Sequence, residues 1–498
     1  MYLNNKIVIG KSDNSELYIV PKMANRHGLI TGASGSGKTT TVKVMAESFS
    51  SAGIPVFYVD VKGDLASICK MGEDNQNINE RLKRMGVENF IFKGFPTTFF
   101  DVFGMKGHPI RTTISDIGPR LLSRMLELSD AQEGILAIIF QIAEDEGMSL
   151  NDLGDLKNLV SYVNDNRNDY ISRYGSITSL SISSIQRSLL MLEQDGGASF
   201  FGKPSLDLFD LLQYDMNGNG FVNVLDAVEL YKKPTLYSVF LIWLLNNLYD
   251  NMPEVGDLDK PKLILFLDEA HLIFSEMSNN LIKSIIQVIK LIRSKGVGVY
   301  FISQSPSDIP DEILSQLGNK VQHVLRSYTP ADDKAIKAIS NSFRSNPSFK
   351  TEDAIKSLAT GEALISFLNE AGEPNVVDRA LILPPQSFMG TISDLERDNV
   401  IKQSRIYMKY ENIVDEVSAS EMVLESKKKK DEEKALEARR KEEEKEKAKQ
   451  DKLKEKEAEK KKKEQDRMMK KVTNQVTNKV IGKATTKVVN SIWKNLFK

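Results

Sequence analysis

The chain has 498 residues, of which 41% are hydrophobic, enough to bury a sizeable core in more than one domain. A single cysteine, Cys69, excludes a disulfide framework and a thiolate metal cluster, and it indicates a reducing cytoplasmic setting. The net charge of −1 is unevenly distributed along the chain. Residues 427–498 carry 26 Lys and Arg against 14 Asp and Glu, a charge of +12, which leaves −13 for residues 1–426. Residues 1–426, which are acidic overall, would need a local basic patch to bind nucleic acid.

No apolar run reaches the roughly 18 residues of a membrane span, and residues 1–14 lack a signal pattern, so we expect a cytoplasmic protein.

The first motif along the chain is GASGSGKT at residues 32–39, which fits the phosphate-binding pattern G-x-x-x-x-G-K-[ST]. A short apolar strand is predicted before it at 27–31, and the apolar spacing after it predicts a helix. In such a loop backbone N–H groups wrap a polyphosphate, and the helix adds its positive N-terminal end. Lys38 would reach the β- and γ-phosphates and Thr39 would hold Mg²⁺. The predicted nucleotide-binding residues are Gly32, Ala33, Ser34, Gly35, Ser36, Gly37, Lys38, Thr39 and Thr40.

Two further strands are predicted next along the chain. Residues 54–60, IPVFYVD, are rich in β-branched and aromatic side chains and run into a turn at 61–64. Residues 88–94, ENFIFKG, have a similar composition. We therefore expect strands at 54–60 and at 88–94.

The middle of the chain changes from strand to helix patterns. Between 110 and 215, apolar residues recur at spacings of three and four, which predicts an all-helical insertion. A strand at 221–225 and an apolar helix at 236–248 follow. The alternation of strands and helices outside the insertion predicts an α/β protein with a parallel sheet covered by helices on both faces.

The segment LILFLDE at 263–269 places two carboxylates after five apolar residues. This is typical of a buried central strand that delivers acids to a Mg²⁺–nucleotide site. Asp268 would hold the metal, and Glu269 would polarise the attacking water, the role that distinguishes a hydrolase from a passive nucleotide binder. His271 follows, and both coupling to a partner and simple packing remain open for it.

A helix is predicted over 281–292, followed by a strand at 297–304 that ends in Gln304. Beside the Asp268 strand, the Gln304 amide would touch the γ-phosphate or the attacking water. A polar residue in the turn before Pro306 is the alternative interpretation.

Four segments together resemble the HerA-like helicase ATPases of the HerA–FtsK superfamily: residues 25–41, 59–66, 265–274 and 296–330. More narrowly, they resemble the branch built on the C-terminal ATPase domain alone, typified by the bacterial YjgR-type proteins. The resemblance covers about residues 5–390. It implies a RecA-like P-loop NTPase core of the additional-strand class, assembly into a hexameric ring and translocation along double-stranded DNA.

The resemblance also implies roles for single residues. Gln304 would be a sensor, and Asp60 and Asp64 match a D-x-x-G-[DE] turn whose acids lie close to the site in relatives. An arginine supplied by the neighbouring subunit completes such sites. Arg326, close to a strand predicted at 321–325, is the first candidate and Arg293 the second.

Relatives that process DNA ends carry an N-terminal β-barrel that docks a nuclease. About 20 residues precede the first predicted strand here, so we do not expect a nuclease partner. The expected organisation is an N-terminal segment at 1–20, an ATPase core at 21–109 and 216–395, the insertion at 110–215 and a helical connector at 396–426.

The tail has two parts. Residues 427–471 are nearly all Lys, Glu, Arg, Asp, Gln and Ala and lack an apolar heptad, which excludes an ordinary coiled coil. A solvated helix with Glu–Lys pairs and a disordered linker are both open. Residues 472–498 combine apolar stripes, including Trp493 and Phe497, with lysines and no acid. Such a basic amphipathic segment suits DNA, an anionic membrane surface, a protein partner or docking on the ring.

The nucleotide-site motifs and what the resemblance implies leave two functions open, an ATP-driven DNA translocase and a ring ATPase that remodels or scaffolds proteins without nucleic acid. A GTPase is not expected, because no N-K-x-D motif specifies guanine: Asn319 and Lys320 continue into Val321 and Gln322. A transporter-type ATPase is not expected either, because the L-S-G-G-Q signature is missing.

Overall fold

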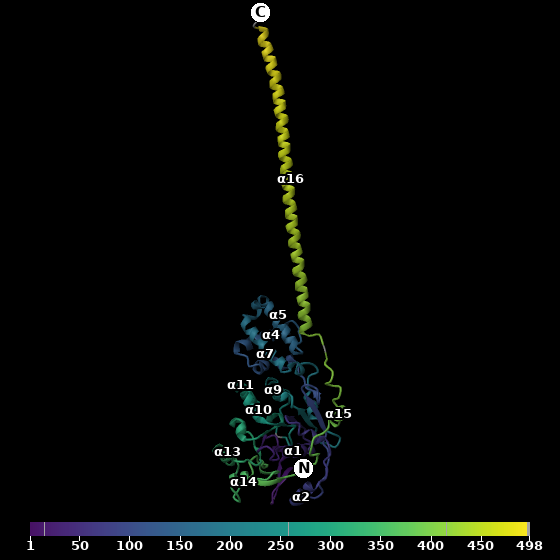
Figure 1. The fold of residues 1–498 in the computed structure, drawn as a ribbon, viewed down its shortest axis with the longest axis vertical. Helices are drawn as coiled ribbons and strands as arrows, with labels where there is room; N and C mark the ends of the chain where they lie inside the picture. Colours follow the sequence, from purple (N-terminus) through teal and green to yellow (C-terminus); the bar gives the residue numbers. More distant parts are fainter. Residues whose placement is uncertain (14, 257, 415, 496–498) are drawn as a thin grey trace. The chain divides into compact units, whose positions relative to one another are not determined.

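The computed structural model describes residues 1–13, 15–256, 258–414 and 416–495, with side chains as far as residue 479 except Glu276. The chain divides into two compact units, Met1–Met422 and Val423–Lys498. The first unit holds a mixed sheet, in which thirteen strands can be described, and the helices that cover it. Many of its helices are labelled in Figure 1, where α4, α5 and α7 form one group and α13 and α14 lie at the other end of the unit.

The predicted central strands form the parallel part of this sheet. They are arranged in the order β4-β10-β9-β5-β8, and every residue in them is buried. Strands covered on both faces consist of continuous apolar runs, which is why the sequence reveals them. The predictions for these strands are confirmed to within two residues: β4 (Gly28–Thr31), β5 (Val56–Asp60), β8 (Val222–Asp226), β9 (Leu263–Leu267) and β10 (Val297–Ser303).

The sheet is parallel only in part, which the expectation of a parallel sheet did not include. Beyond β4 the order is β11-β12-β13-β2-β1, with β3 also paired to β2, and every pairing after β11 is antiparallel. Three of these strands lie within residues 1–20, where no strand was predicted; all three are short, and β2 joins the rest of the sheet only through the distant β13. The bounds are β1 (Tyr2–Leu3), β2 (Lys6–Lys11), β3 (Glu16–Ile19), β11 (Asn319–Gln322), β12 (Glu362–Ser366) and β13 (Asp378–Ile382). The strand predicted at 321–325 thus ends earlier, at Gln322.

The strand predicted at 88–94 is also wrong. These residues form no strand, and the side chain of Ile91 is 67% exposed. Their backbone meets the 386 loop instead, where the Lys93 N–H donates to the Gln386 carbonyl over 3.0 Å. The strand lies just beyond, as β6 (Thr97–Asp101), because there Phe99 and Phe100 are fully buried. The short β7 (His108–Pro109) follows at this edge.

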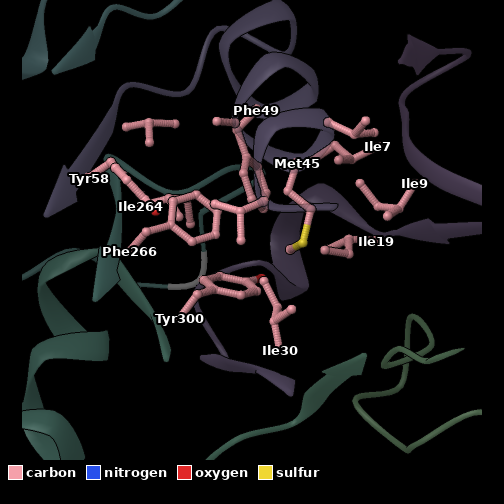
Figure 2. Close-up of a cluster of buried hydrophobic side chains, with 14 of the residues drawn as sticks. Ile7, Ile9, Ile19, Ile30, Met45, Phe49, Tyr58, Ile264, Phe266 and Tyr300 are labelled. Carbon is pink, nitrogen blue, oxygen red and sulfur yellow. The ribbon is translucent and has the colours of Figure 1, made fainter. Parts of the chain in front are cut away.

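Helix α1 (Lys38–Ser51) is held against the sheet by aromatic packing. Figure 2 shows Phe49 of α1 pointing at the strands, with Phe266 and Tyr300 below it. The ring of Phe49 lies 6.1 Å from that of Phe266 and 5.7 Å from that of Tyr300, centroid to centroid. Such pairs contribute about 0.5–1.5 kcal/mol each beyond area burial. The helix that starts at the glycine-rich loop is therefore fixed to the central strands.

The remaining helices of the first unit follow the predicted plan, except that the predicted helical connector at 396–426 is helical only at its two ends, because residues 404–414 and 416–418 form turns, bends and irregular backbone. The all-helical insertion lies between β7 and β8, and the predicted fold class is confirmed in this respect. Its helices are α3 (Ile114–Met125), α4 (Asp130–Asp145), α5 (Leu153–Asp165), α6 (Arg167–Tyr174), α7 (Ser179–Gln194) and α8 (Gly197–Phe200). The others are α2 (Gln76–Met85), α9 (Pro234–Asn251), α10 (Ala270–Glu276), α11 (Asn279–Ile292), α12 (Asp311–Leu314), α13 (Pro330–Asn341), α14 (Thr351–Ser357) and α15 (Asp394–Gln403).

The charged tail is one continuous helix, α16 (Ala419–Asn495), which decides between the two predicted alternatives. Leu436 and Leu453 are more than half exposed, as expected for a solvated helix. Pairs at i,i+4 join Glu and Lys along it, for example Glu437 to Lys441 at 2.6 Å. The apolar side chains predicted to anchor its end, from Val480 onward, lie outside the described residues. Within the described part of the chain, no helix has the length and apolarity needed to cross a membrane.

Candidate active site

The carboxyl ends of three neighbouring parallel strands meet at one edge of the sheet. Ser303 of β10 lies opposite Thr31 of β4, and Phe301 of β10 lies opposite Leu267 of β9. The glycine-rich loop, the acid pair at 268–269 and Gln304 each follow one of these strands. The structure therefore brings the predicted phosphate, metal and sensor residues to the same edge.

The loop at 32–39 has the backbone geometry of an anion cradle. Gly32, Gly35 and Gly37 have φ of 150°, 73° and 107°, values that side chains disfavour. A Cβ on Gly32 would lie 2.5 Å from the Cβ of His323, so close packing also excludes a side chain there. The Oγ of Ser36 is buried in this loop and makes no hydrogen bond with any described residue.

Lys38 begins α1 and folds back over the loop. Its Nζ donates to the carbonyls of Gly32 over 2.6 Å and Ala33 over 3.0 Å. Burial lowers the pKa of Lys38, with the charge of Lys62 acting in the same direction. Ser34 and Gly35 are exposed, whereas Thr39 and Thr40 are half-buried. The Lys38 ammonium group thus lies against the loop, whose residues Ser34 and Gly35 are open to solvent.

The acid pair is buried behind the loop. The Oδ2 of Asp268 accepts from the Tyr58 hydroxyl over 3.1 Å, and its Oδ1 accepts from the Glu269 N–H over 2.9 Å. Burial raises the pKa of Asp268, and the nearby Lys62 opposes that shift. Glu269 has φ 47° and ψ 52°, a left-handed conformation that is uncommon for a side-chain-bearing residue. Such strain is often found at functional sites.

Two basic residues flank the Glu269 carboxylate. Lys62 forms an ion pair with its Oε1. The Nδ1 of His271 lies 3.0 Å from its Oε2, but neither of these two atoms makes a well-aligned hydrogen bond with the described residues. His271, whose role the sequence left open, thus lies against the Glu269 carboxylate. The sequence did not indicate that Lys62 contacts this carboxylate.

Asp60 holds the turn that carries Lys62. Its Oδ1 accepts from the N–H groups of Lys62, Gly63 and Asp64 over 3.2, 2.7 and 3.2 Å, and its Oδ2 accepts from that of Leu65 over 3.0 Å. Burial raises the pKa of Asp60 to about 6, although these hydrogen bonds act against the shift. Asp60 therefore shapes the turn, while Asp64 is exposed.

The sensor candidate and the two arginine candidates lie at different positions relative to the sheet. Gln304 is exposed one residue after β10. Arg326 follows β11, which runs parallel to β4, and it is exposed on the loop's side of the sheet with no side-chain partner among the described residues. Arg293 lies in the short 3₁₀ turn before β10, so it is at the opposite edge of the sheet.

His323 is a site residue that the sequence analysis missed. It is fully buried beneath the loop, where its Nε2 lies 2.9 Å from the Thr41 Oγ1 and its Nδ1 lies 2.9 Å from the Glu362 carbonyl. Burial lowers its pKa to about 4. Since the carbonyl can only accept, Nδ1 carries the proton and Nε2 accepts from the threonine. The one sequence signal was an imidazole within the strand predicted at 321–325.

Comparisons with known proteins agree with this geometry. A family model described as Helicase HerA-like C-terminal matches residues 5–498. The chain belongs to this family. The DNA double-strand break repair helicase HerA of Sulfolobus acidocaldarius is 22% identical over 397 residues, which are 77% of this chain and 70% of the relative. The protein of the same name from Saccharolobus solfataricus is 23% identical over 365 residues, 72% of this chain and 64% of the relative.

Solved structures share the fold. The bacterial conjugative coupling protein TrwBdeltaN70 in its unbound form has a TM-score of 0.51 at 15% identity, over 76% of this chain and 89% of that one. The plasmid coupling protein TrwB in complex with ADP and Mg²⁺ has a TM-score of 0.50 at 14% identity, over 76% and 88%. Family and fold together make this chain a HerA-like P-loop ATPase.

Proposed function

We propose that this protein is a ring-forming motor that hydrolyses ATP and translocates double-stranded DNA. One observation carries the hydrolytic part: the strand register places Lys38 and the buried pair Asp268 and Glu269 at the same edge of the sheet. The DNA part is supported by the relatives from Sulfolobus and Saccharolobus, which are named as helicases.

The residues fit a Mg²⁺–nucleotide complex. The Ser36 Oγ, which has no hydrogen-bond partner in the described part of the chain, and the positive-φ glycines form a cradle of the kind that binds phosphate. Thr39 and Asp268 supply a hydroxyl and a carboxylate, the hard oxygen ligands that Mg²⁺ prefers. When bound there, Mg²⁺ would offset the negative charge of the phosphates. The TrwB structure with ADP and Mg²⁺ supports this fit by its shared fold.

The side chains then divide the work of hydrolysis. Lys38 exchanges its two carbonyl partners for phosphate oxygens, which form stronger, charge-assisted hydrogen bonds with an ammonium group. Glu269 accepts a proton from the attacking water as general base. Gln304 touches the γ-phosphate or that water, and Arg326 of a neighbouring subunit stabilises the charge of the transition state.

The decisive experiment measures whether double-stranded DNA accelerates ATP turnover. The full chain is assayed with Mg²⁺ and ATP, with and without duplex DNA, at several salt concentrations because contacts to phosphate groups weaken with salt. The Lys38→Ala variant is the control for contaminating activity. Faster turnover with DNA supports a translocase. An ATP turnover rate that DNA does not change would favour a ring ATPase acting on protein partners, consistent with the −13 charge of residues 1–426.

A further inference from the structure

We infer that Lys62 is a positioning residue that restrains Glu269 and releases it when a polyphosphate is bound at Lys38. The inference rests on the proposed ATP hydrolysis and adds a regulatory contact within the same site. Lys62 belongs to the turn after β5 and is part of neither the phosphate-binding pattern nor the acid pair.

The first step is the ion pair that holds the proposed general base, Glu269. Lys62 pairs with Oε1 of Glu269, so one oxygen of this carboxylate is engaged by an ammonium group. The other oxygen, Oε2, is buried and makes no hydrogen bond with the described residues. An oxygen engaged by an ammonium group is not free to accept a proton from water, and the other oxygen is buried. In this arrangement Glu269 is poorly placed to act on an attacking water.

The second step is the anchoring of Lys62 itself. Its backbone N–H is one of four that donate to the buried Asp60 carboxylate, so the start of its side chain is fixed. The side chain beyond is 44% exposed, while that of Glu269 is only 9% exposed. The flexible partner in this ion pair is therefore the lysine.

The third step is competition for the ammonium group. Lys62 and Lys38 lie at the same edge of the sheet, because Lys62 is paired with Glu269 just after β9 while Lys38 follows β4, and both strands flank β10 in register. A polyphosphate bound at Lys38 brings several negative charges into this region, and phosphate oxygens accept charge-assisted hydrogen bonds from lysine. It therefore competes with the single carboxylate for Lys62. Transfer of Lys62 to the phosphate leaves Glu269 free to act, which ties water activation to nucleotide binding.

The test compares Lys62→Met, which keeps the length of the side chain and removes its charge, with Lys62→Arg, which keeps the charge. In the ATP complex Lys62 is shared between Glu269 and the phosphates, so part of the restraint persists there. A half-exposed ion pair is worth up to about 1 kcal/mol, so Lys62→Met should raise kcat by up to about five-fold. It should also raise the KM for ATP, since a phosphate contact is lost. Lys62→Arg should remain near wild type.

A matched control is Lys157→Met, which removes another partly exposed lysine paired with a glutamate, Glu193 at 2.5 Å, in the helical insertion. It should leave kcat and KM unchanged. In a Glu269→Gln background, Lys62→Met should no longer raise kcat, because the effect passes through the carboxylate. An unchanged or lower kcat for Lys62→Met in an active protein overturns the inference, whereas an inactive wild type overturns the proposed hydrolysis itself.

Discussion

The buried His323 should make the first unit lose stability as the pH falls, and this can be worked out from its environment. Its pKa is lowered from 6.5 to about 4 by burial, so the folded protein holds the ring neutral while the unfolded chain protonates it. The stabilisation is fully present above about pH 6.5 and decreases as the pH falls toward 4. Between pH 8 and pH 5 the loss is roughly 2 kcal/mol for this one histidine.

The assay is urea unfolding at a series of pH values, followed by tryptophan fluorescence, since Trp243 is buried in this unit. His323→Gln cannot titrate, so its free energy of unfolding should fall less steeply with acid, by roughly 2 kcal/mol over the same interval. His27, whose pKa burial also lowers to about 4, should contribute a similar share and remain in that variant. Thr41→Val is the control, because it removes the hydroxyl at the His323 Nε2 but keeps the titrating ring. Equal pH dependence of wild type and His323→Gln would refute the reasoning.

Three further predictions concern the motor. Lys38→Ala should weaken nucleotide binding and turnover together, whereas Glu269→Gln should still bind and trap nucleotide; wild-type turnover by Glu269→Gln, in a phosphate-release assay, contradicts the acid assignment. Arg326→Ala should lower turnover by on the order of 10³-fold, and mixing it with Glu269→Gln subunits should restore part of the activity at mixed interfaces. An active Arg326→Ala oligomer without such recovery would transfer the role to Arg293. Deletion of 427–498 should leave basal turnover near wild type and weaken salt-sensitive binding to DNA or anionic vesicles; loss of assembly on gel filtration would make the tail part of the ring.

The features that the sequence by itself determined are local ones. The strand Leu263–Leu267 was predicted to the residue, because a strand buried on both faces must be apolar throughout. The loop at 32–39 was predictable because its pattern states a backbone requirement, glycine where φ is positive and lysine at the start of the helix. The acid pair followed from its place at the end of a buried strand.

The tertiary structure decided what depends on distant segments meeting. The antiparallel half of the sheet pairs β2, near the start of the chain, with β13, and no local pattern specifies such a partner. His323 lies against Thr41, 282 residues away in sequence, and only that contact makes it part of the site. The same holds for Lys62 and Glu269: each stands in a recognisable motif, but their ion pair exists because β5 and β9 are neighbours in the sheet. Electrostatic coupling depends on distance in space and on burial, which a linear pattern does not encode.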